Sequence, residues 1–475
     1  LGLPSFIYQK VTNTNHQVTK MATKTKDVET TGLLKKDEDE DIEELEKPYN
    51  RVEFFLDYIV ALCMTALATD LSGKVPGAMD WLWFMLQTWM LWSLWNACIV
   101  LNNMFTIYGL GKHINRDVAI HVNCFNFMLL MVLMTRFALT SEGNPIGWVL
   151  CYIIGRIILV IRVYLVAFFN RNPASLPEEM EQRVQTFREK AQTILYFVPF
   201  ENVPLVLSVL FFRSADNGYK GILMGGYLTW IISFLWCRTQ AQLVDKRNPS
   251  FDHSTQEVDL NDIQERHETI AEFLIGSLLF VGQTFYITVC SVATTLGAFL
   301  LHCQARVNGR TEAYNVSASA SSIAQNLHVL FYCTINVMCV GYYQISAGIE
   351  EVDETEWITD PRQLICFSAG LFLIIYGVLN ALTQDPEIER YKPRWSMVCR
   401  VGFIWTFGVA LVVVGYVPTV CYYSEIFVPL IYMFLAAQQI FVTMAPSSQQ
   451  CERNGGTGGM KSQNRRTTKK HITVV

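Results

Sequence analysis

Long apolar runs separated by short polar stretches fill the chain from about residue 51 to residue 444. Each run has about 20 residues, the length that an α-helix needs to cross the hydrocarbon core of a bilayer. The pattern predicts an all-α polytopic membrane protein with about twelve transmembrane helices. The expected spans are 52–71, 81–107, 117–139, 146–169, 190–212, 220–237, 262–282, 285–304, 321–347, 362–383, 396–420 and 425–444.

Residues 269–303 are ambiguous, because they could form one long helix or two short ones. Lysine and arginine are enriched in cytosolic loops, and this rule favours two helices. Two helices keep most basic residues on one side, whereas a single helix inverts the second half and removes the bias. We therefore predict twelve spans rather than eleven, with both termini in the cytosol. This topology also places the sequon at Asn315 in the cytosol, where it would not be glycosylated.

The chain also repeats itself. Segments 51–57 and 266–272 both read R-x-E-x-x-x-[D/E], at an offset of 215 residues (266 minus 51), and Gly155 recurs as Gly370 at the same offset. Six spans per copy predict two parallel six-helix repeats, an arrangement known from membrane transporters. The expected parts are the first membrane repeat at 51–237, a cytosolic linker at 238–261 and the second membrane repeat at 262–444.

The two ends of the chain are polar and differ in charge. Residues 1–50 contain the run Asp37-Glu38-Asp39-Glu40-Asp41 and predict a disordered acidic cytosolic tail. Residues 445–475 predict a disordered basic cytosolic tail. The net charge of −5 gives no indication of a nucleic-acid partner, and the 13 scattered cysteines indicate neither a disulfide framework nor a metal site.

The repeated acids are the main candidates for chemistry. Glu53 and Asp57 are four residues apart and share a helix face, and Glu268 and Glu272 repeat that spacing, with Glu265 close to the same face. Carboxylates inside a membrane are costly, so they are usually paired, protonated or in contact with water. One interpretation is that both pairs line a polar path for a cation or proton. In the other interpretation they lie at headgroup level, paired with Arg51 and Arg266, and only fix the depth of the helices.

Further polar residues interrupt the apolar runs. His121 and His328 occupy matching repeat positions and could shuttle protons, although a buried histidine is often only hydrogen-bonded. Arg156, in the middle of its span, is a candidate counter-ion. Glu201 lies between Pro199 and Pro204, which should break the helix and expose backbone, as in many transporter binding sites. A kinked packing helix is the alternative.

Enzyme motifs are missing from the sequence. His267 and Glu268 begin an H-E-x-x-H pattern, but Ala271 replaces the second histidine, so the zinc protease motif is incomplete. We find no P-loop, nucleophile elbow or dinucleotide fingerprint and expect neither an enzyme nor a bound cofactor. Trp81, Trp83, Trp89, Trp92 and Trp95 crowd one span, where interface anchoring and packing are the expected roles and a wall for substrate stacking is the alternative.

Several spans resemble the bacterial low-temperature-requirement A (LtrA) family. The family's first span opens E-L-F-F-D, and this chain has Glu53-Phe54-Phe55-Leu56-Asp57. The family's W-x-x-W followed by N-x-F matches Trp92, Trp95, Asn103 and Phe105. Its seventh span, E-R-H-G to L-G-E, is matched by Glu265, Arg266, His267 and Gly276.

The chain departs from this family pattern at two places. Ser277 replaces the closing glutamate and Glu268 replaces a glycine, so a mechanism that uses the deeper acid would need Glu272, about a turn earlier. The resemblance covers roughly residues 51–383 and implies a multi-pass membrane protein, here a eukaryotic relative. It implies no particular activity.

These observations predict a transporter or channel for a cation or a proton-coupled solute. The alternative is a non-transporting membrane scaffold or receptor-like protein whose intramembrane charges are structural. Glu29, Leu33 and Leu34 fit the acidic dileucine pattern that clathrin adaptors recognise, which predicts the plasma membrane or the endosomes and lysosomes. Thr473 and Val475 fit the C-terminal ligand form of PDZ domains.

Overall fold

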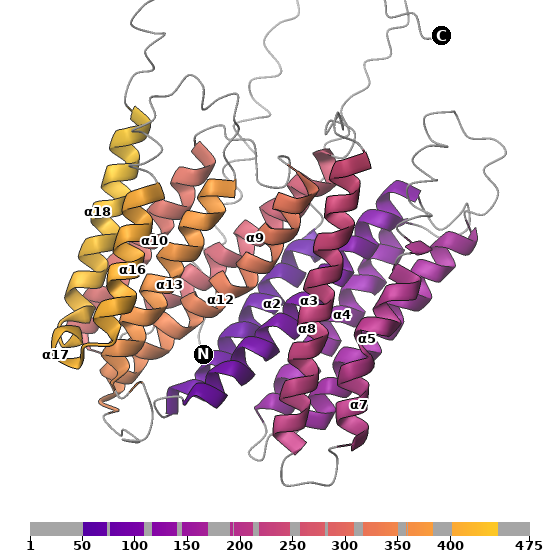
Figure 1. Cartoon of the computed structure of the whole chain (residues 1–475), viewed down its shortest axis with the longest axis horizontal. Helices are drawn as coiled ribbons and strands as arrows, with labels where there is room; N and C mark the ends of the chain where they lie inside the picture. The colour runs from indigo at the N-terminus through magenta and orange to yellow at the C-terminus, as the bar shows by residue number, and fades with distance from the viewer. Residues whose placement is uncertain are drawn as a thin grey trace, which may run out of the picture. The chain divides into compact units, whose positions relative to one another are not determined.

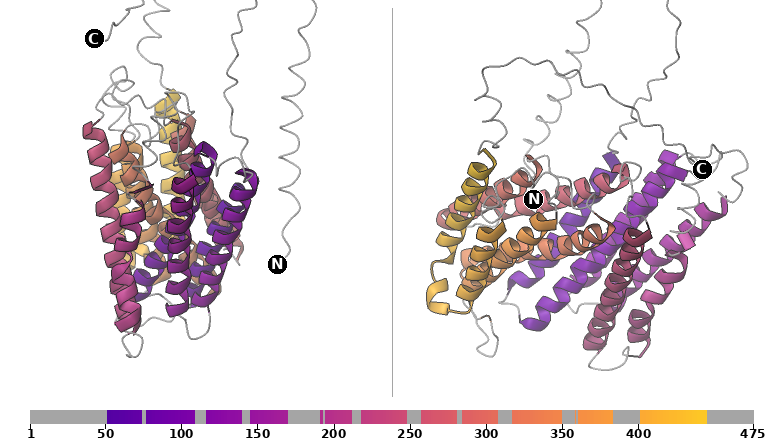
Figure 2. Two further views of the ribbon diagram at one scale, coloured as in Figure 1. Left: turned by 90° about the vertical axis from the view of Figure 1, so that its right-hand side faces the viewer. Right: turned by 45° about the horizontal axis from the view of Figure 1, so that its top comes forward.

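The computed structural model describes the parts of the chain that form its helices. The described residues are 51–73, 77–108, 116–139, 145–169, 191–192, 194–211, 218–247, 257–280, 284–307, 317–349, 358, 360–382 and 401–444. They contain helices and no strands, as Figures 1 and 2 show from three directions, and they belong to one compact unit, Tyr49–Val475. Both predicted tails, the sequon at Asn315, the dileucine pattern and the PDZ ligand lie outside the described residues.

The described residues of the first half form six labelled helices, and a further helical segment, 194–201, precedes the fifth of them. The six labelled helices are α2 (Arg51–Asp70), α3 (Ala78–Tyr108), α4 (Arg116–Ala138), α5 (Pro145–Phe169), α7 (Val203–Phe211) and α8 (Gly218–Arg247). Helices α2 to α5 pack closely on one another, and α7 packs mainly on α8. Figure 1 shows this group in indigo to magenta. The expected spans 52–71, 81–107, 117–139 and 146–169 coincide with α2, α3, α4 and α5 to within about three residues. Helix α8 continues beyond residue 237, and α7 begins 13 residues after the start of the expected span 190–212 (203 minus 190).

The second half forms a second set of helices. They are α9 (Glu257–Ser277), α10 (Phe285–Val307), α12 (Ala318–Ala347), α13 (Pro361–Leu382), α16 (Phe403–Gly415), the short α17 (Pro418–Cys421) and α18 (Ser424–Met444). Helix α13 packs on α12 and α16, and α10 packs on α18. Helices α9 and α12 both contact α2, and α12 also contacts α3 and α8, so these helices connect the two halves.

Within the described residues, nine helices are long and apolar enough to cross a membrane. The protein is therefore an integral membrane protein with multiple membrane-spanning helices. The ambiguous stretch 269–303 divides into α9 with a short 3₁₀ turn, Leu278–Phe280, followed by the separate α10. Helix α9 carries too many charges to be among the nine, and α16 and the stretch Ser424–Ile440 of α18 are shorter apolar segments.

The helix expected to break between two prolines is interrupted. Helical residues 194–201 end at a turn at Asn202, and α7 begins at Val203. Proline has no N–H group, so Pro199 and Pro204 cannot donate the hydrogen bonds that would continue the ladder. The Asn202 side chain stays within the helix ladder, since its Nδ2 donates to the carbonyl oxygen of Val198, four residues earlier, at 2.6 Å.

Two glycines allow α13 and α16 to approach closely. A Cβ atom on Gly370 would lie 2.7 Å from the backbone oxygen of Gly408, and a Cβ on Gly408 would lie 2.9 Å from the backbone oxygen of Gly370. Small residues at such contacts are typical of helix packing in membranes, where close approach provides the van der Waals contact. The repeated position Gly370 is therefore a packing residue.

Replacing Gly370 by alanine should destabilise the protein by about 1–3 kcal/mol, because the extra methyl group overpacks the contact. We expect a lower melting temperature of the detergent-solubilised protein. Gly276→Ala is the matched control, because a Cβ there would meet nothing within 4 Å, and alanine favours a helix by about 1 kcal/mol. Equal melting temperatures for the two variants would contradict the packing role.

Candidate functional site

Two buried stripes bring the acids of α2 against α9. On α2 the buried positions follow helical spacing and include Glu53, Leu56, Asp57, Val60 and Ala61. On α9 the buried positions include Ile263, Arg266, His267, Ile270, Ala271 and Leu274. The polar residues thus lie in register with apolar ones on a face directed into the bundle. Because α2 and α9 pack on each other, Arg266 reaches both acids.

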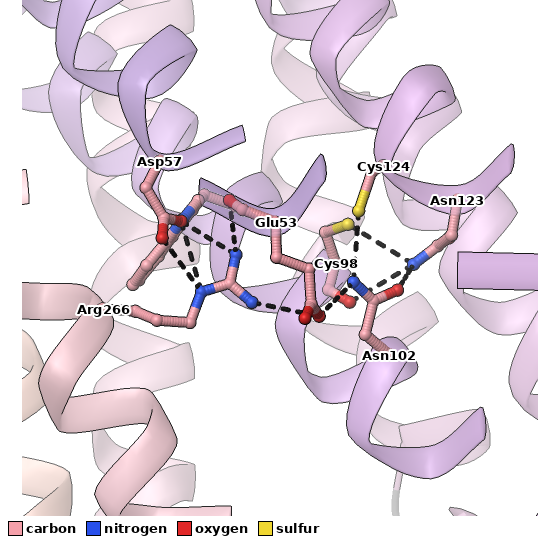
Figure 3. Close-up of polar contacts among 8 residues, drawn as sticks. Glu53, Asp57, Cys98, Asn102, Asn123, Cys124 and Arg266 are labelled. Carbon is pink, nitrogen blue, oxygen red and sulfur yellow. Dashed lines mark hydrogen bonds and ion pairs between the residues drawn. The ribbon is translucent and has the colours of Figure 1, made fainter. Parts of the chain in front are cut away.

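Arg266 forms a buried salt bridge with each of two carboxylates (Figure 3). Its Nη2 donates to Asp57 Oδ1 at 2.8 Å, and its Nε lies 3.2 Å from Asp57 Oδ2. Its Nη1 donates to Glu53 Oε1 at 3.3 Å. Arg266 and Asp57 are 0% exposed and Glu53 is 4% exposed. Both acids are therefore buried inside the helix bundle and pair with Arg266, whereas Arg51 is exposed.

Trp95 of α3 completes the surroundings of Asp57. Its indole Nε1 donates to Asp57 Oδ1 at 2.6 Å. The guanidinium carbon of Arg266 lies 5.8 Å from the centroid of the same ring, within the range of a cation–π contact. Asp57 thus accepts from both Arg266 and Trp95, and all three side chains are buried.

Two asparagines extend the network from Glu53 toward α5. Asn102 Nδ2 donates to Glu53 Oε1 at 2.9 Å, and Asn123 Nδ2 donates to Asn102 Oδ1 at 2.7 Å. Arg162 of α5 in turn donates to Asn123 Oδ1. The thiols of Cys98 and Cys124 lie beside the two amides, as Figure 3 shows. Side chains from α2, α3, α4, α5 and α9 therefore form one continuous polar network.

A group of aromatic rings lies beside Arg266. His267 and His328 have ring centroids 4.7 Å apart, and the ring of Trp95 lies 4.8 Å from that of His267. The hydroxyl of Tyr332 donates to the backbone oxygen of His267 at 3.0 Å and lies 2.7 Å from Nδ1 of the same histidine. Because a hydroxyl group has one proton, Nδ1 is the donor in the second contact. The contact therefore assigns the proton of the neutral His267 ring to Nδ1 and holds the ring in one orientation.

A second buried ion pair joins Arg156 of α5 to Glu201, next to the interrupted helix. Their side chains are 11% and 2% exposed. Arg156 Nη1 also lies 3.4 Å from the hydroxyl oxygen of Ser93. Arg156 is therefore the counter-ion of a buried acid, as expected, and this acid is Glu201, which lies between Pro199 and Pro204.

Replacing Arg156 by methionine should destabilise the protein by about 3–5 kcal/mol, because Glu201 is left as a buried unpaired charge. We expect the double variant Arg156→Met with Glu201→Gln to recover much of the loss, since it removes both charges. Melting temperatures of the two variants test this. A double variant as unstable as the sum of its single variants would show that the two residues do not act as a pair.

The remaining predicted residues differ from Glu53 and Asp57 in how far they are buried. On α9 Glu265 is exposed, and Glu268 and Glu272 are half-buried at the edge of the stripe that contains Arg266. Glu268 accepts a bond from Gln264 at 2.9 Å. The two acid pairs therefore have the same spacing but not the same surroundings: Glu53 and Asp57 are buried, whereas Glu268 and Glu272 are half-buried. The repeated histidines differ in the same way, because His121 is exposed and His328 is buried.

The tryptophans of α3 include three that have the expected packing role. Trp89, Trp92 and Trp95 are buried within the bundle. Trp89 stacks on Trp230 of α8 with centroids 5.4 Å apart, so it is a packing residue. Sequence reasoning missed Trp95, Asn102 and Asn123 as partners of the acids. Their spacing of seven and twenty-one residues carries no signal for such contacts, because helix packing creates them.

Comparison with known proteins adds no relative to this description. No protein-family model, no curated protein and no solved structure matches the chain.

Proposed function

We propose that the chain is a transporter or channel for a cation or a proton-coupled solute. The observation that carries this proposal is the cluster in which Glu53 and Asp57 share Arg266. With both acids ionised, Glu53, Asp57 and Arg266 together have a charge of −1, which Arg162 offsets only through the intervening Asn102 and Asn123. A buried uncompensated charge costs several kcal/mol. Binding of one proton or one cation would remove that cost.

The location of the cluster supports coupling between charge and conformation. Glu53 and Asp57 belong to the first helix of one half, and Arg266 belongs to the first helix of the other. Transporter binding sites commonly lie between repeats, which move against each other. Neutralising one carboxylate would weaken its attraction to Arg266 and would loosen this contact.

The proposal includes twelve spans in two parallel repeats and kinship to LtrA proteins. In support, α2, α4 and α5 have α9, α12 and α13 as counterparts at the repeat offsets. The contacts of α2 with α4 and of α4 with α5 recur as contacts of α9 with α12 and of α12 with α13. The kinship rests on the motif residues of the first, second and seventh spans.

The cellular address is part of the proposal and rests on the tails. Leu33 and Leu34 would bind a clathrin adaptor, and Val475 would enter a PDZ domain pocket. Both motifs require cytosolic tails. We propose the plasma membrane or the endosomes and lysosomes as the site of action, with no enzymatic step.

Reconstitution tests the function directly. The purified full-length chain is placed in liposomes that contain a pH-sensitive dye, and gradients of protons, sodium, potassium or calcium are imposed. We expect a dye response or an ion flux above that of protein-free liposomes. A folded, reconstituted chain with no flux under any gradient would support the scaffold or receptor alternative, in which the buried charges only hold helices together.

A further inference from the structure

We infer that Glu53 is the carboxyl group that binds and releases the proton, and that Asn102, Asn123 and Arg162 form a chain that positions it. This inference rests on the proposed proton-linked function and deepens it. It assigns different tasks to the two acids of the cluster. Asp57 holds Arg266 as a permanent ion pair, and Glu53 changes its charge.

The bonds to the two carboxylates differ in number and strength. Asp57 is bound through both oxygens, by Nε and Nη2 of Arg266 and by the indole of Trp95. A carboxylate that accepts several charge-assisted bonds is strongly stabilised as an anion. Glu53 accepts one amide bond and one longer bond from Arg266, and both end on Oε1. Protonation of Glu53 therefore disrupts fewer bonds than protonation of Asp57.

Burial separates the two acids in the same direction. The side chain of Asp57 is 0% exposed and that of Glu53 is 5% exposed. Glu53 is also the third residue of α2, whereas Asp57 lies about a turn deeper. Glu53 is therefore closer to the end of α2 than Asp57 is. Glu53, the slightly more exposed acid, is thus also the acid with fewer hydrogen bonds to Arg266.

The asparagine chain is directional. Asn102 donates to Glu53 through Nδ2, which leaves its Oδ1 to accept from Asn123. Asn123 in turn accepts from Arg162. Every bond in the chain therefore donates toward Glu53, and the amide orientations are fixed by their neighbours. Both asparagines are 0% exposed, and the half-buried Arg162 ends the chain.

Arg162 limits the charge that accumulates around Glu53. The titratable and charged groups near Glu53 are Asp57, Arg266, Arg162, the thiols Cys98 and Cys124, and, beyond Arg266, His267 and His328. Among these, Arg162 is the second arginine of the network. Its guanidinium is the charged donor at the start of the hydrogen-bonded chain that leads through Asn123 and Asn102 to Glu53.

Infrared difference spectroscopy of the reconstituted chain, between acidic and alkaline buffer, detects the C=O stretching band of a protonated carboxyl group. Two variants each remove one hydrogen bond from one acid. Asn102→Leu removes a bond to Glu53, and Trp95→Phe removes a bond to Asp57. A carbonyl that loses a hydrogen bond absorbs at higher frequency. We expect the band to shift upward in Asn102→Leu and to stay in place in Trp95→Phe.

Further variants test the chain and control the assignment. Glu53→Gln should lose the band, whereas Glu265→Gln, the same change at an exposed acid, should retain it. Asn123→Leu should broaden the band, because Asn102 loses the bond that orients its amide. Should Glu53→Gln fail to fold, the comparison of Asn102→Leu with Trp95→Phe decides alone.

The outcomes separate this inference from the proposed function. A shift only in Trp95→Phe, or no pH-dependent band in the wild-type chain, would overturn the assignment to Glu53. The spectroscopic readout does not depend on flux. A band that follows Asn102 in a chain without flux would retain Glu53 as a proton site and reject transport.

Discussion

Arg266→Gln is expected to cause the largest loss of stability of any single substitution in the described helices. The variant leaves Glu53 and Asp57 buried close together without their shared cation. Breaking a buried ion pair by removing one partner costs about 3–5 kcal/mol, and here one residue serves two carboxylates. We expect a strongly lowered melting temperature in detergent and loss of any flux in liposomes.

Arg51→Gln is the matched control, because it makes the same change at an exposed arginine close to the cluster. Its melting temperature should remain near that of the wild-type chain. Adding Asp57→Asn to Arg266→Gln should restore part of the stability, since only one buried carboxylate then remains. If Arg266→Gln were as stable as Arg51→Gln, the cluster would contribute nothing to the fold.

Asp57→Asn should abolish pH-dependent flux while the protein still reaches the membrane. Asparagine keeps the size of the side chain, and Glu53 with Arg266 then forms a neutral pair. The excess negative charge that attracts a proton or cation is removed, whereas the contact between the two halves persists. Flux in liposomes and surface labelling in cells measure the two effects separately.

Glu272→Gln tests the second acid of the repeat in the same assays. Glu272 is half-buried, about a turn beyond Glu268 on α9, and we expect its neutralisation to abolish pH-dependent flux as well. Glu265→Gln, at an exposed position on the same helix, is the control and should retain flux. Unchanged flux in both Asp57→Asn and Glu272→Gln would exclude a relay through these acids and favour a structural role.

Hydropathy and charge predicted the helical segments of this protein well. The boundaries of α2, α4, α5 and α13 lie within about two residues of the expected spans, because uninterrupted apolar runs have few alternatives in a bilayer. The separation of α9 from α10 followed from loop charges. The interruption at Asn202 followed from the two flanking prolines.

The candidate site was only partly predictable. The spacing of Glu53 and Asp57 placed them on one face of α2, and that face is buried. On α9 the same rule selected Glu268 and Glu272, although the apolar stripe of Ile270, Ala271 and Leu274 continues through Arg266 and His267. The helical spacing of these apolar residues, unlike the repeat of the acids, predicts that Arg266 is on the buried face of α9.

Contacts between distant helices could not be derived from one sequence. Asn102 and Asn123 look like ordinary polar residues in apolar spans, and only the packing of α3 on α4 joins them. His121 and His328 have equal positions in the repeat, yet neighbouring helices bury one and leave the other exposed. The internal repeat therefore predicts the order of the helices, but it does not predict whether a given side chain is buried or exposed.

The separation of 209 residues between Asp57 and Arg266 has a consequence for biosynthesis. At translation rates of about 5–20 residues per second, the ribosome delivers Arg266 roughly 10 to 40 s after Asp57. Throughout that interval α2 must reside in or near the bilayer with two carboxyl groups and without Arg266, the partner that they share in the folded protein. A nascent chain halted before α9 therefore keeps its first helix only weakly inserted, and membrane quality control can distinguish it from the finished protein by that helix.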